Sequence, residues 1–243
     1  MSKPNQPITV GILLIATNKY KHFVQPLIYD LGKNFFKGHV VTIFLFTDDL
    51  NEGYFHDGNL GLKYFKIPSY KFPEVTLYRY KTFLSHGIDI YKDCTHLFYL
   101  DVDMGIVAPV GEEILGDIVA VRHPGFFNGG GSWGNDPASL SYTDPDKRKH
   151  YYAGGFQGGS HDHFLAVADQ LRARIQTDEE NGIMAEWHDE THWNWYLANN
   201  PGFKELTPEY CMVEQQHLRE QWGIAHFQPK IIALAKNHDE LRK

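Results

Sequence analysis

Cysteine is almost absent from this chain, since only Cys94 and Cys211 occur in 243 residues. Two cysteines so far apart give neither a disulfide framework nor a cysteine metal motif, and a reducing compartment is the simplest assumption. An excess of basic charge is also absent, because the formal net charge is -7. Nucleic acids and anionic membranes need a basic surface on their partners. The composition therefore disfavours both classes of partner.

Long apolar segments are missing as well. The strongest one near the start, Ile8 to Ala16, is too short to span a bilayer and lacks a small-residue cleavage pattern. We expect a soluble, cytoplasmic protein without a membrane span, and we interpret this segment as a buried first strand. Hydrophobic residues still make up 42% of the chain, which is ample for a globular core.

Strand-like and helix-like segments alternate through the first hundred residues. Apolar runs predict strands at Ile8 to Ile15, His39 to Phe46, Leu62 to Ile67 and His96 to Leu100, and helical spacing predicts helices at Tyr20 to Phe35 and Leu77 to Ile90. This βαβαβ order predicts an α/β fold with a Rossmann-like, mixed but mainly parallel sheet flanked by helices. No repeat or clear linker divides the chain, so we expect one domain over residues 1–243.

The motif Asp101-Val102-Asp103 follows the last of these apolar runs and is the most informative feature present. Side chains alternate along an extended chain, so the two carboxylates project from one face. Such a pair suits Mg²⁺ or Mn²⁺, with substrate phosphates completing the coordination shell. A surface turn after a buried strand is the alternative interpretation. Ligands of parallel sheets bind at the carboxyl ends of strands, where Thr17-Asn18 also falls.

A second constellation is the run from Trp187 to Trp193. His188 and His192 have the spacing of a zinc hydrolase, but that motif needs Glu directly after the first His, and Asp189 stands there. The order therefore argues against zinc. Taken singly, Asp189 is a natural N-cap for a helix from Glu190 to Ala198, and Glu190 an ordinary residue of the helix surface.

Seven segments in this order and spacing resemble glycosyltransferase family 6, which includes the histo-blood-group A and B transferases and the α1,3-galactosyltransferase. They are Ile15 to Tyr20, Tyr78 to Thr82, Phe98 to Asp103, His123 to Phe127, Tyr151 to Ser160, Trp187 to His192 and Leu206 to Tyr210. The resemblance implies a GT-A fold, a UDP-sugar donor and retaining α1,3 transfer to a galactose-type acceptor, with or without fucose. It divides the domain into a nucleotide-binding half, about residues 8–103, and an acceptor and donor-sugar half, about residues 104–243.

On the donor side, the resemblance implies that Asp101 and Asp103, with Val102 between them, hold Mn²⁺ or alternatively Mg²⁺ against the diphosphate. The uridine pocket is matched by four residues, with Tyr20 stacking on uracil: Ile15, Ala16, Thr17 and Tyr20. A core aromatic is the alternative for Tyr20. Arg79 matches a contact to the donor sugar and phosphate, with a solvated helix arginine as the alternative. Lys71 takes another arginine position of the family, where its contact to phosphate would be monodentate.

Near the reaction centre, Glu190 matches the residue beneath the anomeric carbon. Two roles for it stay open: a covalent glycosyl intermediate, or stabilisation of an oxocarbenium-like ion. By the same resemblance, Asp189 bonds the donor-sugar hydroxyls and His188 lines the site. His123 and Trp187 meet the acceptor, where an aromatic face suits the apolar side of a galactose ring. Core packing is the alternative for His188 and Trp187.

By the same resemblance, donor choice is linked to Ala153-Gly154-Gly155, where in the family a small last residue leaves room for an acetamido group. Gly155 therefore favours UDP-GalNAc over UDP-Gal. The loop from Asn128 to Tyr142 lacks the Phe-Thr-Tyr-Glu-Arg-Arg run of the family, so the acceptor is not specified. Lys236 and Arg242 are candidates for a basic tail over the diphosphate, with a frayed tail as the alternative.

The chain shows neither the anchor nor the stem of mammalian members, which predicts a soluble bacterial or phage member. Two alternative functions also remain open. A UDP-sugar hydrolase would use the same site if water replaced the acceptor. A non-catalytic glycan-binding protein on the same scaffold would need neither UDP nor metal, and retention of Asp101, Asp103 and Glu190 argues against it.

Overall fold

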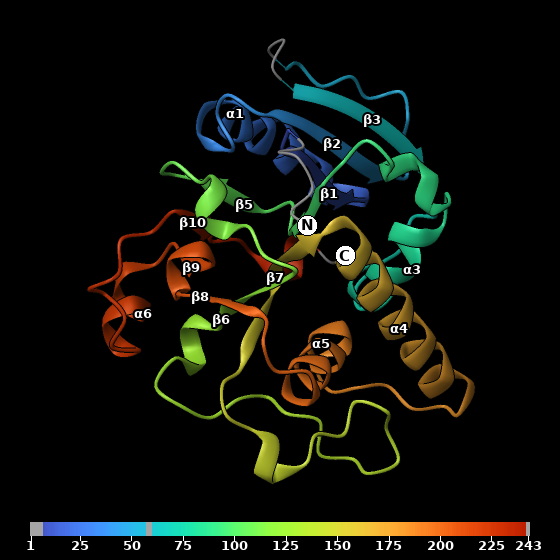
Figure 1. The fold of residues 1–243 in the computed structure, drawn as a ribbon, viewed down its shortest axis with the longest axis vertical. Coiled ribbons are helices and arrows are strands. Elements are labelled where there is room, and N and C mark those ends of the chain that lie inside the picture. Colours follow the sequence, from blue (N-terminus) through green and yellow to red (C-terminus); the bar gives the residue numbers. More distant parts are fainter. Residues whose placement is uncertain (1–6, 57–59, 242–243) are drawn as a thin grey trace, which may run out of the picture.

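The computed structural model describes residues 7–56 and 60–241. Its centre is a seven-stranded sheet with the order β3-β2-β1-β4-β7-β6-β8 (Figure 1). The four strands β3, β2, β1 and β4 run parallel, β7 is antiparallel to β4 and β6, and β8 is parallel to β6. The strands are β1 (Thr9–Ala16), β2 (Val40–Thr47), β3 (Leu60–Lys66), β4 (His96–Leu100), β6 (Ile118–Arg122), β7 (Tyr152–Ser160) and β8 (Lys204–Leu206). The predicted mixed, mainly parallel α/β sheet is confirmed.

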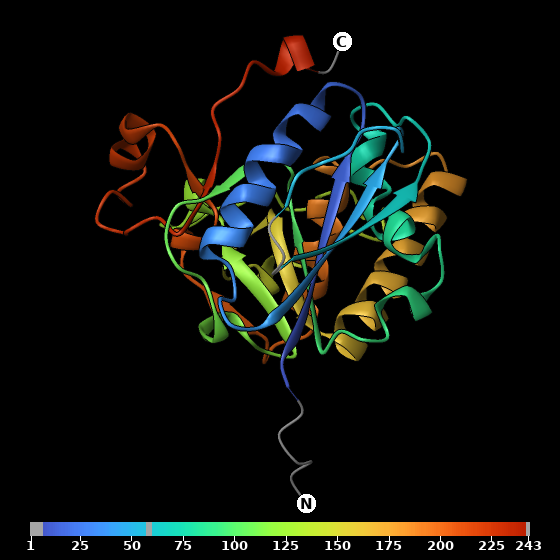
Figure 2. The ribbon, with the colours of Figure 1, turned by 90° about the horizontal axis from the view of Figure 1, so that it is seen from above.

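Helices cover both faces of this sheet, as Figure 2 shows from above. The α-helices of the described residues are α1 (Val24–Asn34), α2 (Glu74–Leu77), α3 (Arg79–Leu84), α4 (His161–Glu180), α5 (His188–Asn199), α6 (Gln216–Gln221) and α7 (His238–Leu241), of which the last two lie away from the seven-stranded sheet. Strand β1 shows why its sequence is apolar throughout. Ile12 and Leu14 pack into the core beneath α1, whereas Leu13 and Ile15 pack into the core with α3, α4 and α5.

A second, three-stranded sheet brings the end of the chain back to the middle. It has the order β5-β10-β9 and consists of β5 (Met104–Ile106), β10 (Ile231–Ala233) and β9 (Met212–Val213). Because β5 directly follows Asp103 and pairs antiparallel with β10, the residues after β10 lie beside the Asp101-Val102-Asp103 motif. The amide of Leu234 donates to the carbonyl of Asp103 at 3.0 Å.

The predicted helices differ from the observed ones in detail. The segment Tyr20 to Phe35 divides into a 3₁₀ turn at Asn18–Phe23 followed by α1. The expected helix from Leu77 to Ile90 is wrong: α2 and α3 are both short, and a separate 3₁₀ turn, Ile88–Tyr91, comes after Gly87. Gly87 has φ 78°, a left-handed conformation that glycine adopts freely and that ends a helix.

Helix α5 begins at His188 and is preceded by Trp187 as its N-cap residue. Asp189 therefore lies inside the first turn, and the prediction that it caps the helix is wrong. Two acidic residues in the first turn, Asp189 and Glu190, still suit the positive end of the helix dipole. The turn places both carboxylates near the edge of the sheet where β7 begins.

Candidate active site

The site lies where three strands meet at one edge of the sheet. Strands β1 and β4 are parallel neighbours with Leu13 opposite Tyr99, so their carboxyl ends lie side by side. Strand β7 runs antiparallel to β4, and its beginning therefore reaches the same edge. The amide of Asp101 donates to the carbonyl of Gly155 at 2.9 Å. This geometry unites motifs that are more than fifty residues apart in sequence.

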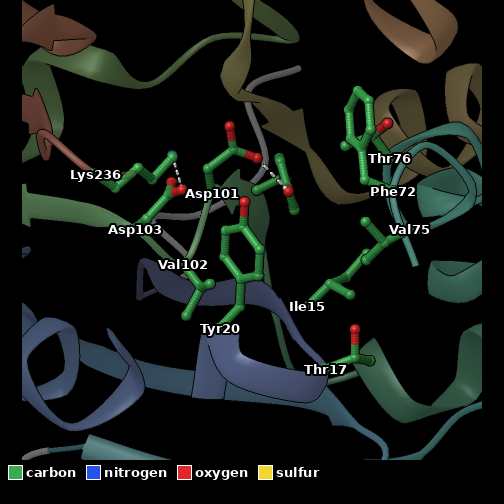
Figure 3. Close-up of a pocket in the computed structure, with 11 residues that line it drawn as sticks. Ile15, Thr17, Tyr20, Phe72, Val75, Thr76, Asp101, Val102, Asp103 and Lys236 are labelled. Atoms are coloured by element: carbon green, nitrogen blue, oxygen red, sulfur yellow. Dashed lines mark hydrogen bonds and ion pairs between the residues drawn. The ribbon is translucent and has the colours of Figure 1, made fainter. Parts of the chain in front are cut away.

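A cavity of about 110 Å³ opens at this edge (Figure 3). A second one of about 190 Å³ shares Thr17, Tyr20, Phe72 and Val75 with it. Seven residues that the sequence predicted for the donor line the first cavity: Ile15, Thr17, Tyr20, Asp101, Val102, Asp103 and Lys236. Lys71 lines the second cavity. Ala16 does not line either, because its side chain is buried in the core beneath α1. Arg242 lies outside the described residues.

Both carboxylates of the motif are compensated by cations. The ammonium group of Lys236 forms an ion pair with Asp103, which is 5% exposed, and Figure 3 shows this contact at the cavity. The hydroxyl of Tyr99 donates to Oδ1 of Asp101 at 2.5 Å, and the guanidinium of Arg79 lies 3.4 Å from the same oxygen. Lys236 also lies 5.9 Å from the ring centre of Tyr20. The end of the chain therefore crosses the cavity.

These oxygens fit the chemistry of a hard divalent cation, which prefers carboxylate ligands. Within residues 7–56 and 60–241, no group of three or more His, Cys, Asp or Glu side chains is arranged to hold a metal ion. Two carboxylates alone would leave most of an octahedral shell to phosphate oxygens and water, as is usual for Mg²⁺. The positive charge of Lys236 on Asp103 shows that this carboxylate already attracts a cation from the cavity side.

Arg79 connects the motif to α5 and is 3% exposed, so its interpretation as a solvated surface arginine is wrong. Its Nε lies 3.0 Å from Oδ2 of Asp189, in an ion pair between two buried side chains. Its guanidinium lies 4.1 Å from the ring centre of Tyr99 and donates to the carbonyl of Gly154. Burial raises the pKa of Asp189 to about 7, although the charge of Arg79 opposes this shift.

Glu190 is held by the backbone of β7. The amide of Gly154 donates to Oε2 of Glu190 at 2.7 Å. The carbonyl of Gly154 accepts from Arg79 and, at 3.1 Å, from Nε2 of Gln157. Gln157 is fully buried and in turn accepts from the hydroxyl of Tyr80 at 2.8 Å. The backbone N–H and C=O of Gly154 therefore link Glu190, the buried Arg79 and the buried amide of Gln157.

The predicted acceptor residues lie around Glu190 in different environments. Trp187 is 51% exposed, so the interpretation of this ring as core is wrong. Nδ1 of His123 accepts from the amide of Gly125 at 3.1 Å, and its ring lies 5.8 Å from that of Tyr151. Burial lowers the pKa of His123, while the charge of Glu190 opposes the shift. The ring of His188 lies edge-on to Phe72 at 5.1 Å.

Close approach explains why small residues follow Ala153. A Cβ atom on Gly155 would lie 2.9 Å from Oδ2 of Asp101 and 2.5 Å from Cε of Met104. A Cβ atom on Gly154 would lie 3.2 Å from Oε2 of Glu190. Both glycines therefore leave room for the carboxylates themselves, a reason that is independent of the shape of the donor sugar.

Sequence reasoning missed several residues of the site. Tyr99 lies two positions before Asp101, so the period of two along an extended chain was a signal that could have found it. The cavity residues Phe72, Val75 and Thr76 carry no local signal, because their position depends on how the segment before α3 folds back over β1. Gln157 on β7 carries none either, because its buried partner Tyr80 comes from α3.

Comparison with known proteins agrees with this geometry. The sequence profile described as Glycosyltransferase family 6 matches residues 3–243. The histo-blood group ABO system transferase 1 of Rattus norvegicus is 31% identical over 246 residues, which cover 98% of this chain and 69% of the relative. The globoside alpha-1,3-N-acetylgalactosaminyltransferase 1 of Gallus gallus is 28% identical over 244 residues, covering 97% of this chain and 69% of the relative. The globoside alpha-1,3-N-acetylgalactosaminyltransferase 1 of Homo sapiens is 30% identical over 218 residues, covering 86% and 62%.

No helix within the described residues has both the length and the apolar character needed to cross a membrane.

Proposed function

The chain belongs to glycosyltransferase family 6 and is therefore a hexosyltransferase with a GT-A-like α/β fold. From this premise we propose that it transfers GalNAc, or alternatively Gal, from its UDP-sugar to a galactose-containing glycan. In this proposal the transfer retains the anomeric configuration, forms an α1,3 linkage and depends on a divalent metal, Mn²⁺ or Mg²⁺. The whole chain acts as one catalytic domain. About residues 8–103 hold the nucleotide, and about residues 104–243 hold the donor sugar and the acceptor.

The observation that carries the proposal is the continuous set of contacts between the Asp101-Val102-Asp103 motif and Glu190. Arg79 contacts Asp101, Asp189 and the carbonyl of Gly154. The amide of the same glycine donates to Glu190. A diphosphate held at the motif would therefore have its sugar directed toward Glu190, which is the arrangement that glycosyl transfer needs.

The donor nucleotide fits the cavity at the ends of β1 and β4. We assign uracil to the side lined by Thr17 and Tyr20, where an aromatic face is available for stacking. The diphosphate then lies near Asp101, Asp103 and Lys236. A divalent metal bound by the two carboxylates would neutralise the charge that develops on the UDP leaving group.

The residues of this chain would contribute to catalysis by position and charge. Glu190 offers a carboxylate next to the anomeric carbon, where positive charge develops in an oxocarbenium-like transition state. The hydrogen bond from Gly154 fixes the orientation of that carboxylate. Asp189 contacts the donor-sugar hydroxyls, with Arg79 holding it in place. His123 and Trp187 position the acceptor, and the exposure of Trp187 suits a ring that stacks on galactose.

The test is to incubate the protein with UDP-GalNAc or UDP-Gal, with Mn²⁺, Mg²⁺ or EDTA, and with or without a galactoside that carries or lacks fucose. Release of UDP and formation of sugar product are measured together. Metal-dependent release of UDP matched by an α-linked product supports the proposal. Release matched only by free sugar would replace it with a UDP-sugar hydrolase, and absence of release with every donor would contradict enzymatic activity on these substrates.

A further inference from the structure

A loop between β6 and β7, here the 132–143 loop (residues 132–143), borders the candidate reaction centre. The hydroxyl of Tyr151 donates to the carbonyl of Ser132 at 3.2 Å, and the ring of Trp133 lies edge-on to that of Tyr151 at 5.2 Å. Burial raises the pKa of the Tyr151 hydroxyl, and the charge of the neighbouring Glu190 adds to this shift. Among the described residues that line the two donor cavities, none comes from this loop. It therefore faces Glu190 from outside the nucleotide site.

The loop has little regular structure of its own but is closed by backbone contacts. Gly134 and Tyr142 form an isolated bridge, and the amide of Thr143 donates to the carbonyl of Gly134 at 3.1 Å. A Cβ atom on Gly134 would lie 2.4 Å from the carbonyl oxygen of Ser141, so the two sides of the loop touch. Displacement of one side must therefore displace the side that carries Trp133.

Two side chains of α4, one helical turn apart, bind the loop at Leu140. Oδ1 of Asp178 accepts from the amide of Leu140 at 2.8 Å, and the guanidinium of Arg174 donates to its carbonyl. Oδ2 of Asp178 also accepts from the hydroxyl of Ser139 at 2.6 Å. Asp178 is 2% exposed, so these bonds replace water entirely. Removing either the buried carboxylate or its hydrogen-bond partners destabilises a protein far more than breaking an ion pair on the surface.

Asp178 also contacts the helix that carries the reaction carboxylate. Nε2 of His192, which is 1% exposed, lies 3.5 Å from Oδ2 of Asp178. His192 follows Glu190 by two residues on α5. The contacts therefore form a ring: Asp178 holds Ser139 and Leu140, the loop carries Trp133 onto Tyr151, and Tyr151 lies beside Glu190.

From this ring we propose that Asp178 is a positioning residue that fixes the 132–143 loop as one wall of the acceptor site. The inference rests on the proposed glycosyl transfer, because a wall next to Glu190 and outside the nucleotide site can only select what attacks the donor sugar. The loop then favours a glycan hydroxyl over water. Asp178 does not contact either substrate, and its effect passes through the loop.

The variants D178A and D178N test this role. D178A removes the acceptor of the Leu140 amide and of the Ser139 hydroxyl, whereas D178N keeps an oxygen for the amide of Leu140 and should be the milder change. D169N is the matched control, since Asp169 lies on the same helix in an exposed pair with Arg172 at 2.7 Å. We expect D178A to raise the acceptor KM by about tenfold or more, the loss typical of a buried charge-assisted hydrogen bond. The fraction of donor lost as free sugar should rise, while UDP release without acceptor stays within about twofold of the wild type, as for a bond that acts only on the acceptor wall.

Hydrogen exchange of the backbone amides of residues 132–143, measured without substrates, provides a readout that does not depend on activity. We expect faster exchange there in D178A, less in D178N and no change in D169N. If exchange rises but the acceptor KM and the free-sugar fraction do not move, the loop is held by Asp178 but is not the acceptor wall, and the proposal is wrong. If hydrogen exchange of residues 132–143 does not change in either Asp178 variant, Asp178 does not hold the loop and the proposal is wrong. Failure of the wild type to release UDP from any donor would instead contradict the proposed function and leave the exchange result to be judged by itself.

Discussion

In the proposed site, the donor side is held together by charges, whereas the acceptor side is held by hydrogen bonds to the backbone. Around the cavity, Lys236 and Arg79 compensate the carboxylates of Asp103 and Asp101. Around the 132–143 loop, Arg174 and Asp178 bind the peptide groups themselves. Charge pairs at a cavity can be exchanged for the charges of a ligand, but buried peptide groups lose their partners only at high cost. In the proposed function, the nucleotide would thus meet a lysine that can rearrange, and the acceptor a wall that is already formed.

Replacement of Glu190 by Gln should have the largest effect, because this carboxylate lies where the two sides meet. Gln keeps the size of the side chain and an oxygen that accepts from Gly154, but it removes the negative charge next to the anomeric carbon. We expect transfer and donor hydrolysis both to fall by about 10³-fold, within the range for loss of a catalytic carboxylate. Product formation and calorimetric binding of UDP would be measured together.

UDP binding should change little in this variant, because Glu190 does not line either donor cavity. E180Q, which changes an exposed glutamate at the end of α4, is the control. Retention of more than about a tenth of the activity by E190Q would be incompatible with a catalytic carboxylate at this position.

Replacement of Asp103 by Asn addresses the charges of the donor side. The amide cannot carry the charge that a divalent cation needs, and it also releases Lys236. We expect activity to fall by about 10²-fold and the metal concentration for half-maximal activity to rise. A titration of Mn²⁺ against initial rate measures both, with the exposed Asp117 changed to Asn as the control. An unchanged metal titration would show that Asp103 does not bind the metal.

The sequence predicted the residues that line the cavity far better than the contacts of the 132–143 loop, and the reason is physical. A parallel strand covered on both faces is apolar throughout, so β4 could be predicted residue by residue at His96–Leu100. The polar motif that ends it then falls at a ligand-binding edge by topology alone. Only the family resemblance indicated a catalytic role for Glu190, because no local pattern distinguishes it from a residue of the helix surface.

Contacts between distant segments could not be predicted in this way. The sequence left a solvated surface position open as the alternative for Arg79, because nothing near it in the chain shows that Asp189 will lie 3.0 Å away. That pair exists because β7 is inserted antiparallel beside β4 and carries α5 to the same edge. The bond between Asp178 and the amide of Leu140 is another such contact, since no local signal marks Asp178 near the end of a long polar helix. The residues of a buried network can be identified only after the order of the strands in the sheet is known.

Replacement of Gly155 by Ala sharpens the comparison, because this glycine lies between the two sides. The added Cβ atom would come within 2.9 Å of Oδ2 of Asp101, so that carboxylate must shift from its position beside Arg79. We expect the rate to fall by about tenfold with UDP-GalNAc and with UDP-Gal alike, which is the cost of a displaced ligand group. Parallel assays with both donors measure this.

A loss with UDP-GalNAc alone, with the rate on UDP-Gal kept, would favour the sequence-based view that Gly155 acts only by leaving room for the acetamido group. G154A is a useful comparison, because its Cβ atom would approach Glu190 instead. It should affect the rate with every donor without changing the metal titration.

Replacement of Lys236 by Met removes the cation that now compensates Asp103. Without donor, the affinity of the protein for Mn²⁺ should increase, because the metal no longer competes with the ammonium group. We expect a change of about fivefold, corresponding to about 1 kcal/mol. Calorimetric titration of Mn²⁺ in the absence of UDP measures it, and K230M is the control, since Lys230 pairs with Glu113 at 2.7 Å. A weaker or unchanged affinity would contradict the competition.

The acceptor side should respond to pH through stability. Burial lowers the pKa of His192 to about 4, with Asp178 opposing and Arg174 supporting the shift. In the unfolded chain His192 binds a proton near pH 6.5, whereas in the folded protein its side chain stays neutral down to about pH 4. Stability is therefore kept above pH 6.5 and is lost as the pH falls through this window, by about 2 kcal/mol at pH 5. The melting temperature should fall by several degrees more between pH 8 and pH 5 in the wild type than in H192Q.

The wild type must be compared with H192Q because the titration of another buried group, Asp189, changes stability with pH in the opposite direction. The raised pKa of Asp189 makes the folded protein bind a proton that the unfolded chain has released, so its contribution decreases as the pH rises from about 4 to about 7. Both the wild type and H192Q contain Asp189, and the difference between their pH profiles isolates His192. The exposed His163, changed to Gln, serves as the control. Identical profiles for the wild type and H192Q would mean that His192 is protonated in the folded state as readily as in the unfolded chain, and that the acceptor side is not the dry, preformed wall that its hydrogen bonds indicate.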